Sequence, residues 1–560
     1  MKKIVKVALD LPIYKEFDYL SECENEDIIS GVRVEVPFGT KKKIGIVLES
    51  VNYTNERHNY VLKKINKVID NFPLIDKNMM YLCKWAADYY QYPLGQVLFS
   101  TLPLKLKKGA NRDYYSNSKF KNNIENTDIK IKVELNDDQK KTYEEIISHL
   151  SSFNVNLLEG ITGSGKTEVY IKLAEKILIN GGQILILVPE INLTPQTVSR
   201  FEKYLNCDVA CYHSSLTDKN KFITWDACSN GEIDILIGTR SSIFIPFQDL
   251  KMIIVDEEHD SSLKQMEKFK YHARDIALVR AKKLKIPVVL GSATPSFESI
   301  HNARNGRYKQ LFLKKRYYNT SMPTVTVVDL NKDTSEDNLS STLIRKIKKE
   351  LNKDGQVLVF VNRRGFSSVM MCKKCGWISK CSRCDAHMTY HKINEYLQCH
   401  HCGKIDYINK KSTCHCGDNG EYIFLGSGTE RIEIKLKKIF PNHNVVRVDS
   451  DSVNNIKKLE NFRKSCIEGK IDIIVGTQML VKGHDFPNLN LVAVVNIDSA
   501  LFSHDFRSTE KISQQLVQVS GRSGRKSENS EVIIQTRVPN HPLINELLAK
   551  GYANFSSKAL

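Results

Sequence analysis

Short apolar runs alternate with amphipathic stretches between residues 135 and 305. The apolar runs are rich in valine, isoleucine and leucine and lie at 155–158, 184–188, 233–237, 252–255 and 288–290. Runs of this length and composition predict buried strands. After the first run, apolar residues recur at i, i+3, i+4 and i+7 from Tyr170, which is helical spacing. Strands that alternate with helices predict a parallel α/β sheet with ligands at the strand ends.

A second series of the same kind follows. It begins at 357–361, is interrupted by a cysteine-rich segment, resumes from Val445 and continues with the runs 471–475 and 491–497. The fold class is therefore predicted as α/β, with two parallel-sheet lobes and a module inserted into the second lobe.

The first 106 residues show a different, mixed pattern. Residues 31–39 and 44–48 look like strands separated by the basic turn 41–43, and a helical pattern covers 79–90. Residues 107–133 are polar and rich in Asn and Lys, which is typical of a linker. An Asn or Asp at 136–138 then caps the next helix. We expect a small N-terminal mixed, β-rich domain.

Length and charge limit the function class. A chain of 560 residues is too long for one core. The net charge of +18 favours a polyanionic partner, nucleic acid first and a membrane surface second, although a lysine-rich proteome gives the same excess. Lys6 and Asp10 interrupt any signal-peptide core, and no stretch approaches 18 apolar residues, so we expect no membrane span and a cytoplasmic protein.

The sequence GITGSGKT at 160–167 lies between a predicted strand and a predicted helix. That context is the one a phosphate-binding loop requires, because glycines let backbone N–H groups close around phosphates at a helix N-terminus. Lys166 is expected to reach the β- and γ-phosphates and Thr167 to hold Mg²⁺. The phosphate-binding glycines are Gly160, Gly163 and Gly165. The alternative is a glycine-rich turn without a ligand.

Two further segments complete a hydrolytic site. Asp256 and Glu257 follow the strand at 252–255, so Asp256 is expected to hold Mg²⁺ and Glu257 to polarise the attacking water. Arg522 and Arg525 lie on a glycine-rich turn of the second lobe and suit charge stabilisation on a transferring phosphoryl group. Taken alone, the first segment also fits a helix cap and the second an exposed basic turn.

Eight of the 14 cysteines fall between 372 and 416. They form three C-x₂-C pairs and one shorter C-x-C pair: Cys372/Cys375, Cys381/Cys384, Cys399/Cys402 and Cys414/Cys416. Eight thiolates fit two tetrahedral Zn²⁺ sites, and full thiolate sets leave no open position for catalysis. The histidines in this segment are not needed as ligands, with His415 as the exception to consider. Metal binding is favoured over disulfides.

The segment 263–274 interleaves basic and aromatic residues directly after the Asp256 strand. Phe269 and Tyr271 are expected to stack on bases and the lysines to contact phosphates, so that strand contact is coupled to hydrolysis. The alternative is an exposed loop with two core aromatics.

Taken together, these segments resemble a superfamily two helicase, and more closely the PriA family of replication-restart helicases (primosomal protein N′). The resemblance rests on LVPEINLTPQ at 187–196, GTRS at 238–241, GSATPS at 291–296, VFVNRRG at 359–365, GTQMLVKGHDFP at 476–487 and QVSGRSGR at 518–525. The eight-cysteine insertion between the motifs at 359–365 and 476–487 distinguishes this family from other helicases.

The resemblance implies RecA-like lobes and particular site residues. One zinc is shared by Cys372, Cys375, Cys414 and Cys416, and the other by Cys381, Cys384, Cys399 and Cys402. Gln139 joins the ATP-contacting set. A pocket for the leading-strand 3′ end consists of Phe17, Asp18, Tyr19, Gly39 and Lys63.

The implied domains are a 3′-end-binding domain (1–106), a linker (107–134), the first helicase lobe (135–305), the start of the second lobe (306–371), the zinc-binding insertion (372–417), and the rest of the second lobe with a C-terminal tail (418–560). The family's winged-helix domain and C-terminal DNA-binding domain are expected to be absent.

The implied function is that of an ATP-dependent 3′→5′ DNA helicase. It recognises stalled or branched forks, unwinds the lagging-strand arm and initiates primosome assembly. The alternative is a fork-binding adaptor in which ATPase is secondary. Implied cofactors are ATP, Mg²⁺ and two Zn²⁺. Implied partners are forked and single-stranded DNA, the single-strand-binding protein, primosome proteins and the replicative helicase loader, at the bacterial nucleoid.

Overall fold

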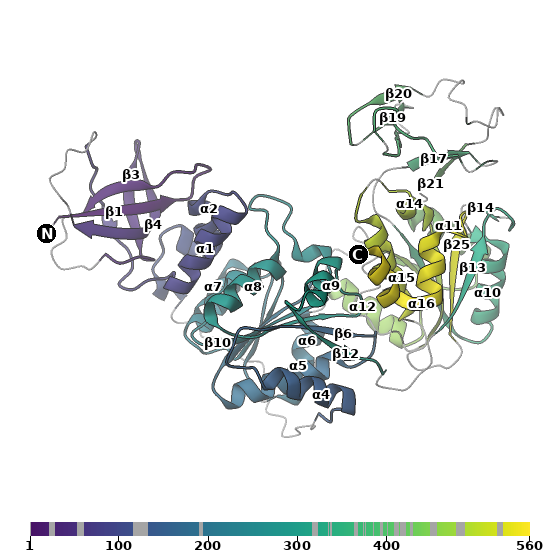
Figure 1. Cartoon of the computed structure of the whole chain (residues 1–560), viewed down its shortest axis with the longest axis horizontal. Coiled ribbons are helices and arrows are strands. Elements are labelled where there is room, and N and C mark those ends of the chain that lie inside the picture. The colour runs from purple at the N-terminus through teal and green to yellow at the C-terminus, as the bar shows by residue number, and fades with distance from the viewer. Residues whose placement is uncertain are drawn as a thin grey trace. The chain divides into compact units, whose positions relative to one another are not determined.

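The computed structural model describes the chain except residues 1, 22–27, 53–60, 116–132, 190–193, 206, 316–322, 334, 337–338, 363–367, 373–374, 376, 385, 392–395, 400, 408–413, 415–421, 426–428, 449–455, 478–485, 487, 504 and 523–529. It divides into two compact units (Figure 1). The first comprises Met1–Gly160, Gly165–Pro295 and Asn302–Leu313, and the second Ile161–Ser164, Ser296–His301 and Lys314–Leu560.

The N-terminal domain is a five-stranded antiparallel sheet followed by helices. The strand order is β2-β1-β4-β3-β5. The strands are β1 (Lys3–Leu9), β2 (Phe17–Ser21), β3 (Arg33–Phe38), β4 (Lys41–Asn52) and β5 (Lys67–Val68), and the helices are α1 (Lys77–Tyr89), α2 (Leu94–Ser100) and α3 (Leu104–Lys107). Alternate valines fill the space under the sheet, as period-2 spacing requires. The mixed, β-rich domain predicted from the sequence is confirmed.

One buried ion pair lies inside this domain. Arg33 is fully buried on β3, and its guanidinium donates to both carboxylate oxygens of Asp70, at 2.9 Å and 2.6 Å. Arg33 Nη1 also donates to the carbonyl of Leu106 at 2.5 Å. The pair therefore ties the sheet to the end of the helical segment.

The first lobe is a seven-stranded parallel sheet with the order β12-β6-β11-β10-β7-β9-β8. Its strands are β6 (Val155–Gly160), β7 (Gln183–Leu187), β8 (Val209–Tyr212), β9 (Ile235–Gly238), β10 (Leu250–Asp256), β11 (Val288–Ser292) and β12 (Lys309–Leu313). Its helices are α4 (Asp137–Ile147), α5 (Lys166–Ile179), α6 (Thr194–Tyr204), α7 (Asp218–Ser229), α8 (Ala273–Leu284) and α9 (Phe297–Arg304), with the 3₁₀ turns η1 (Arg112–Tyr115), η3 (Arg240–Phe244) and η4 (Ser261–Leu263).

The N-terminal domain and the first lobe share one apolar core. A single cluster of buried residues runs from Leu98, Phe99 and Leu106 to Trp225 and Ile276. Trp225 Nε1 donates to the carbonyl of Thr101 at 3.0 Å across this junction. The two domains therefore form one continuous body.

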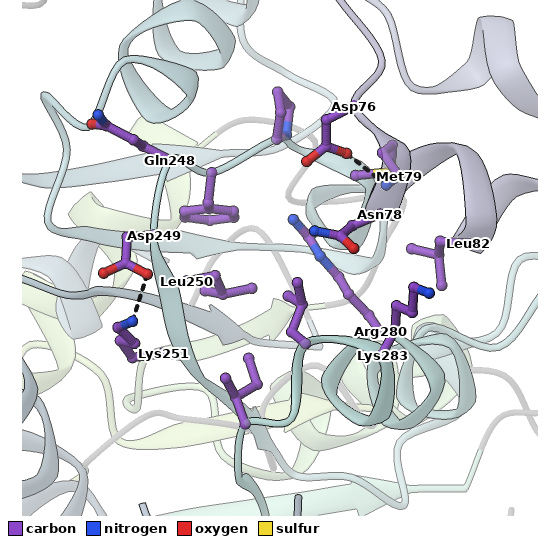
Figure 2. Close-up of a pocket in the computed structure, with 14 residues that line it drawn as sticks. Asp76, Asn78, Met79, Leu82, Gln248, Asp249, Leu250, Lys251, Arg280 and Lys283 are labelled. Atoms are coloured by element: carbon purple, nitrogen blue, oxygen red, sulfur yellow. Dashed lines mark hydrogen bonds and ion pairs between the residues drawn. The ribbon is translucent and has the colours of Figure 1, made fainter. Parts of the chain in front are cut away.

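The junction encloses a cavity of about 230 Å³ between α1, α8 and the start of β10 (Figure 2). Arg280 extends into it and donates to the carbonyls of Ile243 and Ile245 at 2.6 Å and 2.8 Å, which closes the end of η3. Burial lowers the pKa of this guanidinium to about 10. The cavity thus brings polar side chains into a junction that is otherwise apolar.

Part of the segment expected to be a linker is ordered. Arg112, in η1, pairs with Asp226 of α7 and donates to Ser229 Oγ at 2.7 Å, and Tyr115 contacts the Phe222 ring edge-on at 5.1 Å. The reason is that η1 carries an arginine and a tyrosine, Tyr115, that find partners on α7. The linker prediction is therefore wrong for residues 112–115.

The second lobe is a six-stranded parallel sheet with the order β13-β25-β24-β16-β23-β22. Its strands are β13 (Thr324–Asp329), β16 (Gln356–Val361), β22 (Val445–Val448), β23 (Ile473–Gly476), β24 (Leu489–Val495) and β25 (Glu531–Thr536), with a short antiparallel pair, β14 (Ser335–Glu336) and β15 (Leu339–Ser340). Its helices are α10 (Ser341–Leu351), α11 (Thr429–Ile439), α12 (Ile456–Ile467), α14 (Asp498–Leu501), α15 (Ser508–Ser520) and α16 (Pro542–Ala559). The predicted α/β class with two lobes is confirmed.

The inserted module is a five-stranded antiparallel sheet with the order β20-β19-β18-β17-β21. Its strands are β17 (Ser368–Cys372), β18 (Thr389–His391), β19 (Tyr396–Gln398), β20 (Ile405–Tyr407) and β21 (Tyr422–Leu425). The sheet extends beyond the expected limits of 372–417, because β17 and β21 pair with each other and close the insertion at its base. None of the described helices combines the length and the apolar character needed to cross a membrane.

Candidate nucleotide and DNA sites

The phosphate loop lies where the sequence predicts it, between buried β6 and α5. Gly163 and Gly165 adopt φ of 80° and 82°, a left-handed conformation that glycine accepts without strain. Lys166 begins α5, and its Nζ donates to the carbonyl of Gly160 at 3.1 Å. The loop therefore curls back over its own lysine at a helix N-terminus, which is the geometry that binds phosphate.

Gln139 supports this loop from α4. It forms a capping box with Asn136, in which each side chain accepts a backbone N–H of the other residue at 2.9 Å. Its Nε2 donates to the carbonyl of Gly165 at 3.3 Å, and a Cβ on Gly165 would lie 2.2 Å from that nitrogen. Glycine is favoured at this position because its φ of 82° strains any other residue, and the glutamine side chain also occupies the space a Cβ would need.

Asp256 ends β10 next to the phosphate loop. Tyr170 Oη, from α5, donates to Asp256 Oδ1 at 3.0 Å. Burial and the neighbouring Glu257 carboxylate raise the pKa of Asp256 to about 6, and the Lys166 ammonium opposes the rise. Glu257 adopts a left-handed φ of 47°. The structure thus brings Lys166, Asp256 and Glu257 to one edge of the sheet.

The residues that follow Glu257 are held firmly. Glu258 is fully buried and accepts from Arg274 Nη1 of α8 at 2.9 Å. His259 Nδ1 lies 2.7 Å from Ser292 Oγ at the end of β11. Arg274, Tyr170 and Ser292 support this strand end, a role that the sequence pattern does not reveal. Tyr170 was counted only as a core position, since its periodicity does not reveal where its hydroxyl points.

Arg522 lies two residues after the end of α15, beyond the cap residue Gly521, in the second unit, and is nine-tenths buried. Arg525 and Cys416 lie outside the residues that the structure describes.

The cysteines form two groups of sulfur atoms. Cys381, Cys384, Cys399 and Cys402 place one sulfur each within 4.8 Å of the others. Cys372, Cys375 and Cys414 form a second group by the same criterion. Backbone N–H groups of Arg383 and Cys384 lower the pKa of the Cys381 thiol, because they stabilise its thiolate. Thiolates converging at this distance, with amide donors behind them, suit a tetrahedral metal ion.

Four of the residues expected at the DNA 3′ end lie near one another in the N-terminal domain, three of them along β2 and one on the β3–β4 turn. Phe17 and Asp18 lie on edge strand β2, and the Phe17 ring meets the Phe38 ring edge-on at 5.3 Å, next to the exposed turn at Gly39. Leu20 N donates to the carbonyl of Lys63 at 2.9 Å, which adds Lys63 to the same edge. Four of the five residues are thus exposed or half-buried together.

Tyr19 is different. It is 4% exposed, and its hydroxyl donates to the carbonyl of Pro37 at 3.1 Å. Successive side chains on a strand face opposite ways, so the ring next to Asp18 enters the core. In this arrangement the Tyr19 ring cannot stack on a base, and it contributes to the packing of the sheet instead.

Phe269 and Tyr271 are also buried, each 6% exposed. Phe269 packs against Tyr92 at 5.2 Å and Tyr271 against Phe244 at 5.2 Å. The segment alternates Lys and aromatic residues, so its lysines face solvent while its rings enter the junction with the N-terminal domain. The expectation that these two rings stack on bases is corrected: in this structure they hold the junction.

Known protein families match successive parts of the chain, in the same order as the domains described above. Residues 6–103 match the 3′DNA-binding domain family of PriA, 136–303 the DEAD/DEAH box helicase family, 381–404 the PriA DNA helicase Cys-rich region domain, and 403–527 the helicase conserved C-terminal domain family. The chain is therefore a helicase of the DEAD/DEAH class that carries a DNA-binding domain and a Cys-rich, zinc-ribbon-like region.

Curated relatives identify the family to which the chain belongs within this helicase class. The replication restart protein PriA of Haemophilus influenzae is 41% identical, and the alignment covers 100% of this chain and 85% of that protein. The PriA proteins of Bacillus subtilis and Rickettsia conorii are 42% and 34% identical, with 75% and 100% of this chain covered and 53% and 84% of theirs. The chain belongs to the PriA family of replication-restart DNA helicases.

Proposed function

We propose that the chain is an ATP-driven motor that unwinds the lagging-strand arm of stalled forks in the 3′→5′ direction and then starts primosome assembly. The observation that carries this proposal is the shared core of the N-terminal domain and the first lobe. The domain proposed to bind the DNA 3′ end and the sheet edge proposed to hydrolyse nucleotide therefore belong to one body. Fork geometry and ATP hydrolysis are thereby linked mechanically.

At the nucleotide site, the backbone N–H groups of the loop with Gly160, Gly163 and Gly165 surround the phosphates. Lys166 leaves the Gly160 carbonyl and contacts the β- and γ-phosphates. Glu257 orients the attacking water. Arg522 and Arg525 stabilise the charge that develops on the transferred phosphoryl group.

Thr167 and Asp256 are the residues suited to hold Mg²⁺. A divalent cation fits here because burial and the adjacent Glu257 raise the pKa of the half-buried Asp256 carboxylate, and a positive charge at this point would oppose that rise and keep the carboxylate ionised. The cation neutralises charge on the β- and γ-phosphates when bound. Gln139 acts through the loop, since its side-chain amide contacts Gly165 and the Asn136 backbone.

Eight thiolates hold two Zn²⁺ ions in the Cys-rich module, and both are structural. Cys381, Cys384, Cys399 and Cys402 form one site, whose four sulfurs already converge. Cys372, Cys375 and Cys414 form the other together with Cys416. Four-thiolate sites leave no open coordination position, so zinc stabilises the fold here.

At the fork, Asp18 accepts a hydrogen bond from the free 3′-hydroxyl of the leading strand. Phe17 contacts the terminal base, and Lys63 contacts a phosphate beside the open turn at Gly39. The single-strand-binding protein, primosome proteins and the helicase loader are the partners proposed for the cytoplasmic, nucleoid-associated protein.

Lys166→Ala tests the motor. We expect the loss of DNA-stimulated ATPase and of strand separation on a synthetic fork, with fork affinity unchanged, since the substitution lies away from the DNA-contacting edge of β2. Thr197→Ala, a polar residue of α6 in the same lobe, is the matched control. Fork restart that persists without ATPase would establish the adaptor function instead. Stimulation by RNA as strong as by forks would also contradict the proposal.

A further inference from the structure

Helix α1 carries aromatic side chains on the face opposite its fully buried residues, where Trp85 packs partly against the core. Its buried residues are Met79, Met80, Leu82, Cys83, Ala86 and Ala87. Tyr81, Trp85 and Tyr89 lie on the opposite side, four residues and therefore about 6 Å apart along the helix. Tyr81 is 44% and Tyr89 64% exposed, and Trp85 is half-buried. We refer to these three residues as the α1 stripe.

Two of the rings of the α1 stripe are held in place by contacts with neighbouring rings. The rings of Trp85 and Tyr89 stack at 4.8 Å with an interplanar angle of 15°, and Tyr90 meets both rings edge-on. Trp85 covers one face of Tyr89, yet most of the Tyr89 side chain remains exposed. Rings fixed in this way can accept a flat, unpaired base at little cost in conformational entropy.

Positive charge accompanies the rings. Lys283 of α8 places its Nζ 4.5 Å from the centroid of the Tyr81 ring, and Lys77 and Lys84 are exposed on the same side of α1. Asp88 is the acidic residue on this side of the helix among those described. Aromatic rings interleaved with lysines are the surface that single-stranded nucleic acid binds, through base stacking and phosphate contacts.

The stripe leads toward the residues proposed for the 3′ end. Tyr14 is 72% exposed, and its hydroxyl donates to the carbonyl of Gln91, just beyond the end of α1, at 2.5 Å. This bond holds the loop before β2 to Gln91, two residues after Tyr89 in the sequence. Phe17 begins β2 three residues later in the sequence. A strand bound at Phe17 and Asp18 therefore has the stripe within reach.

We propose that the α1 stripe is a second site for single-stranded DNA, where unpaired bases next to the fork's 3′ end stack on Tyr89 and Tyr81 while Lys77, Lys84 and Lys283 contact the backbone. This inference rests on the proposed function, in that it places the 3′ end at Asp18. The stripe contributes affinity without sequence preference, because every base has a face to stack.

Tryptophan emission reports directly on this site. The chain has three tryptophans, Trp85, Trp225 and Trp377. Trp225 is 1% exposed and therefore shielded from DNA. In a full-length Trp377→Phe protein, a 3′-tailed duplex is titrated while fluorescence anisotropy of the labelled DNA measures binding. We expect the bound DNA to quench the tryptophan emission, and the quench to disappear when Trp85→Phe is added.

Two substitutions measure the contribution of stacking. Tyr89→Ala is expected to weaken binding of the tailed duplex about tenfold, the effect of losing one stacked base. Tyr114→Ala, at a half-exposed tyrosine of η1 outside the stripe, is expected to change it less than twofold. A tail with abasic sites is expected to bind without quenching.

Full binding without any change in tryptophan emission would overturn the proposal, as would equal quenching by a tail with abasic sites. Asp18→Asn separates this result from the proposed function. If the 3′-end assignment is wrong, a free and a blocked 3′-hydroxyl give equal affinity in both proteins, while quenching at Trp85 remains. If only the stripe is wrong, the 3′-hydroxyl preference remains and quenching is absent.

Discussion

The junction of the N-terminal domain with the first lobe and the Cys-rich module are stabilised in different ways. The junction has a continuous apolar core that extends from Leu98 to Ile276. The module has a core of Met370, Met388 and Leu397, completed by cysteines. Apolar burial scales with size, so a large body is stable through packing, whereas a module this small needs cross-links. We therefore expect the module, and not the junction, to depend on a metal ion for its stability.

Metal removal is the change with the largest expected effect. Treatment with a strong chelator, or Cys399→Ser, should unfold the module, since structural zinc contributes on the order of 10 kcal/mol to small domains. Limited proteolysis should then cut within residues 368–425, while the junction stays intact. Cys83→Ser, at a buried cysteine of α1, is the control that should release no zinc. A module that resists protease after complete zinc loss would contradict the expected difference between a junction stabilised by packing and a module stabilised by metal.

Breaking the Arg33–Asp70 pair should have the next largest effect. Asp70→Ala leaves the Arg33 guanidinium buried without its carboxylate, so we expect the free energy of unfolding to fall by about 3–5 kcal/mol. Denaturant unfolding followed by circular dichroism measures the change. Replacement of both residues, as Arg33→Met with Asp70→Leu, should recover much of the loss; equal damage from the single and double variants would show that packing dominates.

Acid should weaken the junction through His272. Burial first, and then the Arg274 charge, lower the pKa of His272 to about 4. A histidine with a depressed folded-state pKa binds its proton more readily when unfolded, so its contribution to stability is complete above about pH 6.5 and is lost as pH falls toward 4. The slope is at most about 1.4 kcal/mol per pH unit. His272→Asn should flatten the pH profile between 6.5 and 4; an unchanged profile would refute this role.

Tyr90→Phe should have the smallest effect. His272 N donates to Tyr90 Oη at 3.1 Å, and the substitution removes that acceptor while it keeps the ring contacts with Phe269. We expect a loss of about 1 kcal/mol in the free energy of unfolding. Tyr81→Phe, at an exposed tyrosine of the same helix, should be neutral. Similar losses in both variants would mean that the bond to His272 contributes nothing specific.

Local pattern was sufficient for the nucleotide-binding edge. Residues 155–167 contain a buried strand, a glycine turn and a helix within one short segment, and Asp256 directly follows another apolar run. Both features depend on neighbours in sequence, so spacing and residue type identify them. The family resemblance added Phe17 and Asp18, for which the local pattern gives no signal.

Long-range packing was not predictable from the same sequence. The ring of Phe269 is buried because Tyr90 and Tyr92, far earlier in the chain, supply its partners, and Tyr271 packs against Phe269 and Phe244. The period-2 alternation of Lys and aromatic residues at 268–271 was the available signal, and it indicates two opposite faces. The pairing of β17 with β21 likewise joins residues separated by the whole insertion.

Strand separation on a synthetic fork tests the central claim, that one body links the DNA 3′ end to the motor. Two forks are compared that differ only in whether the leading strand ends in a free or a blocked 3′-hydroxyl at the junction. We predict faster unwinding of the lagging-strand arm on the free 3′-hydroxyl, and loss of that difference in Asp18→Asn with basal ATPase retained. Equal unwinding of the two forks by the unsubstituted protein would contradict the account.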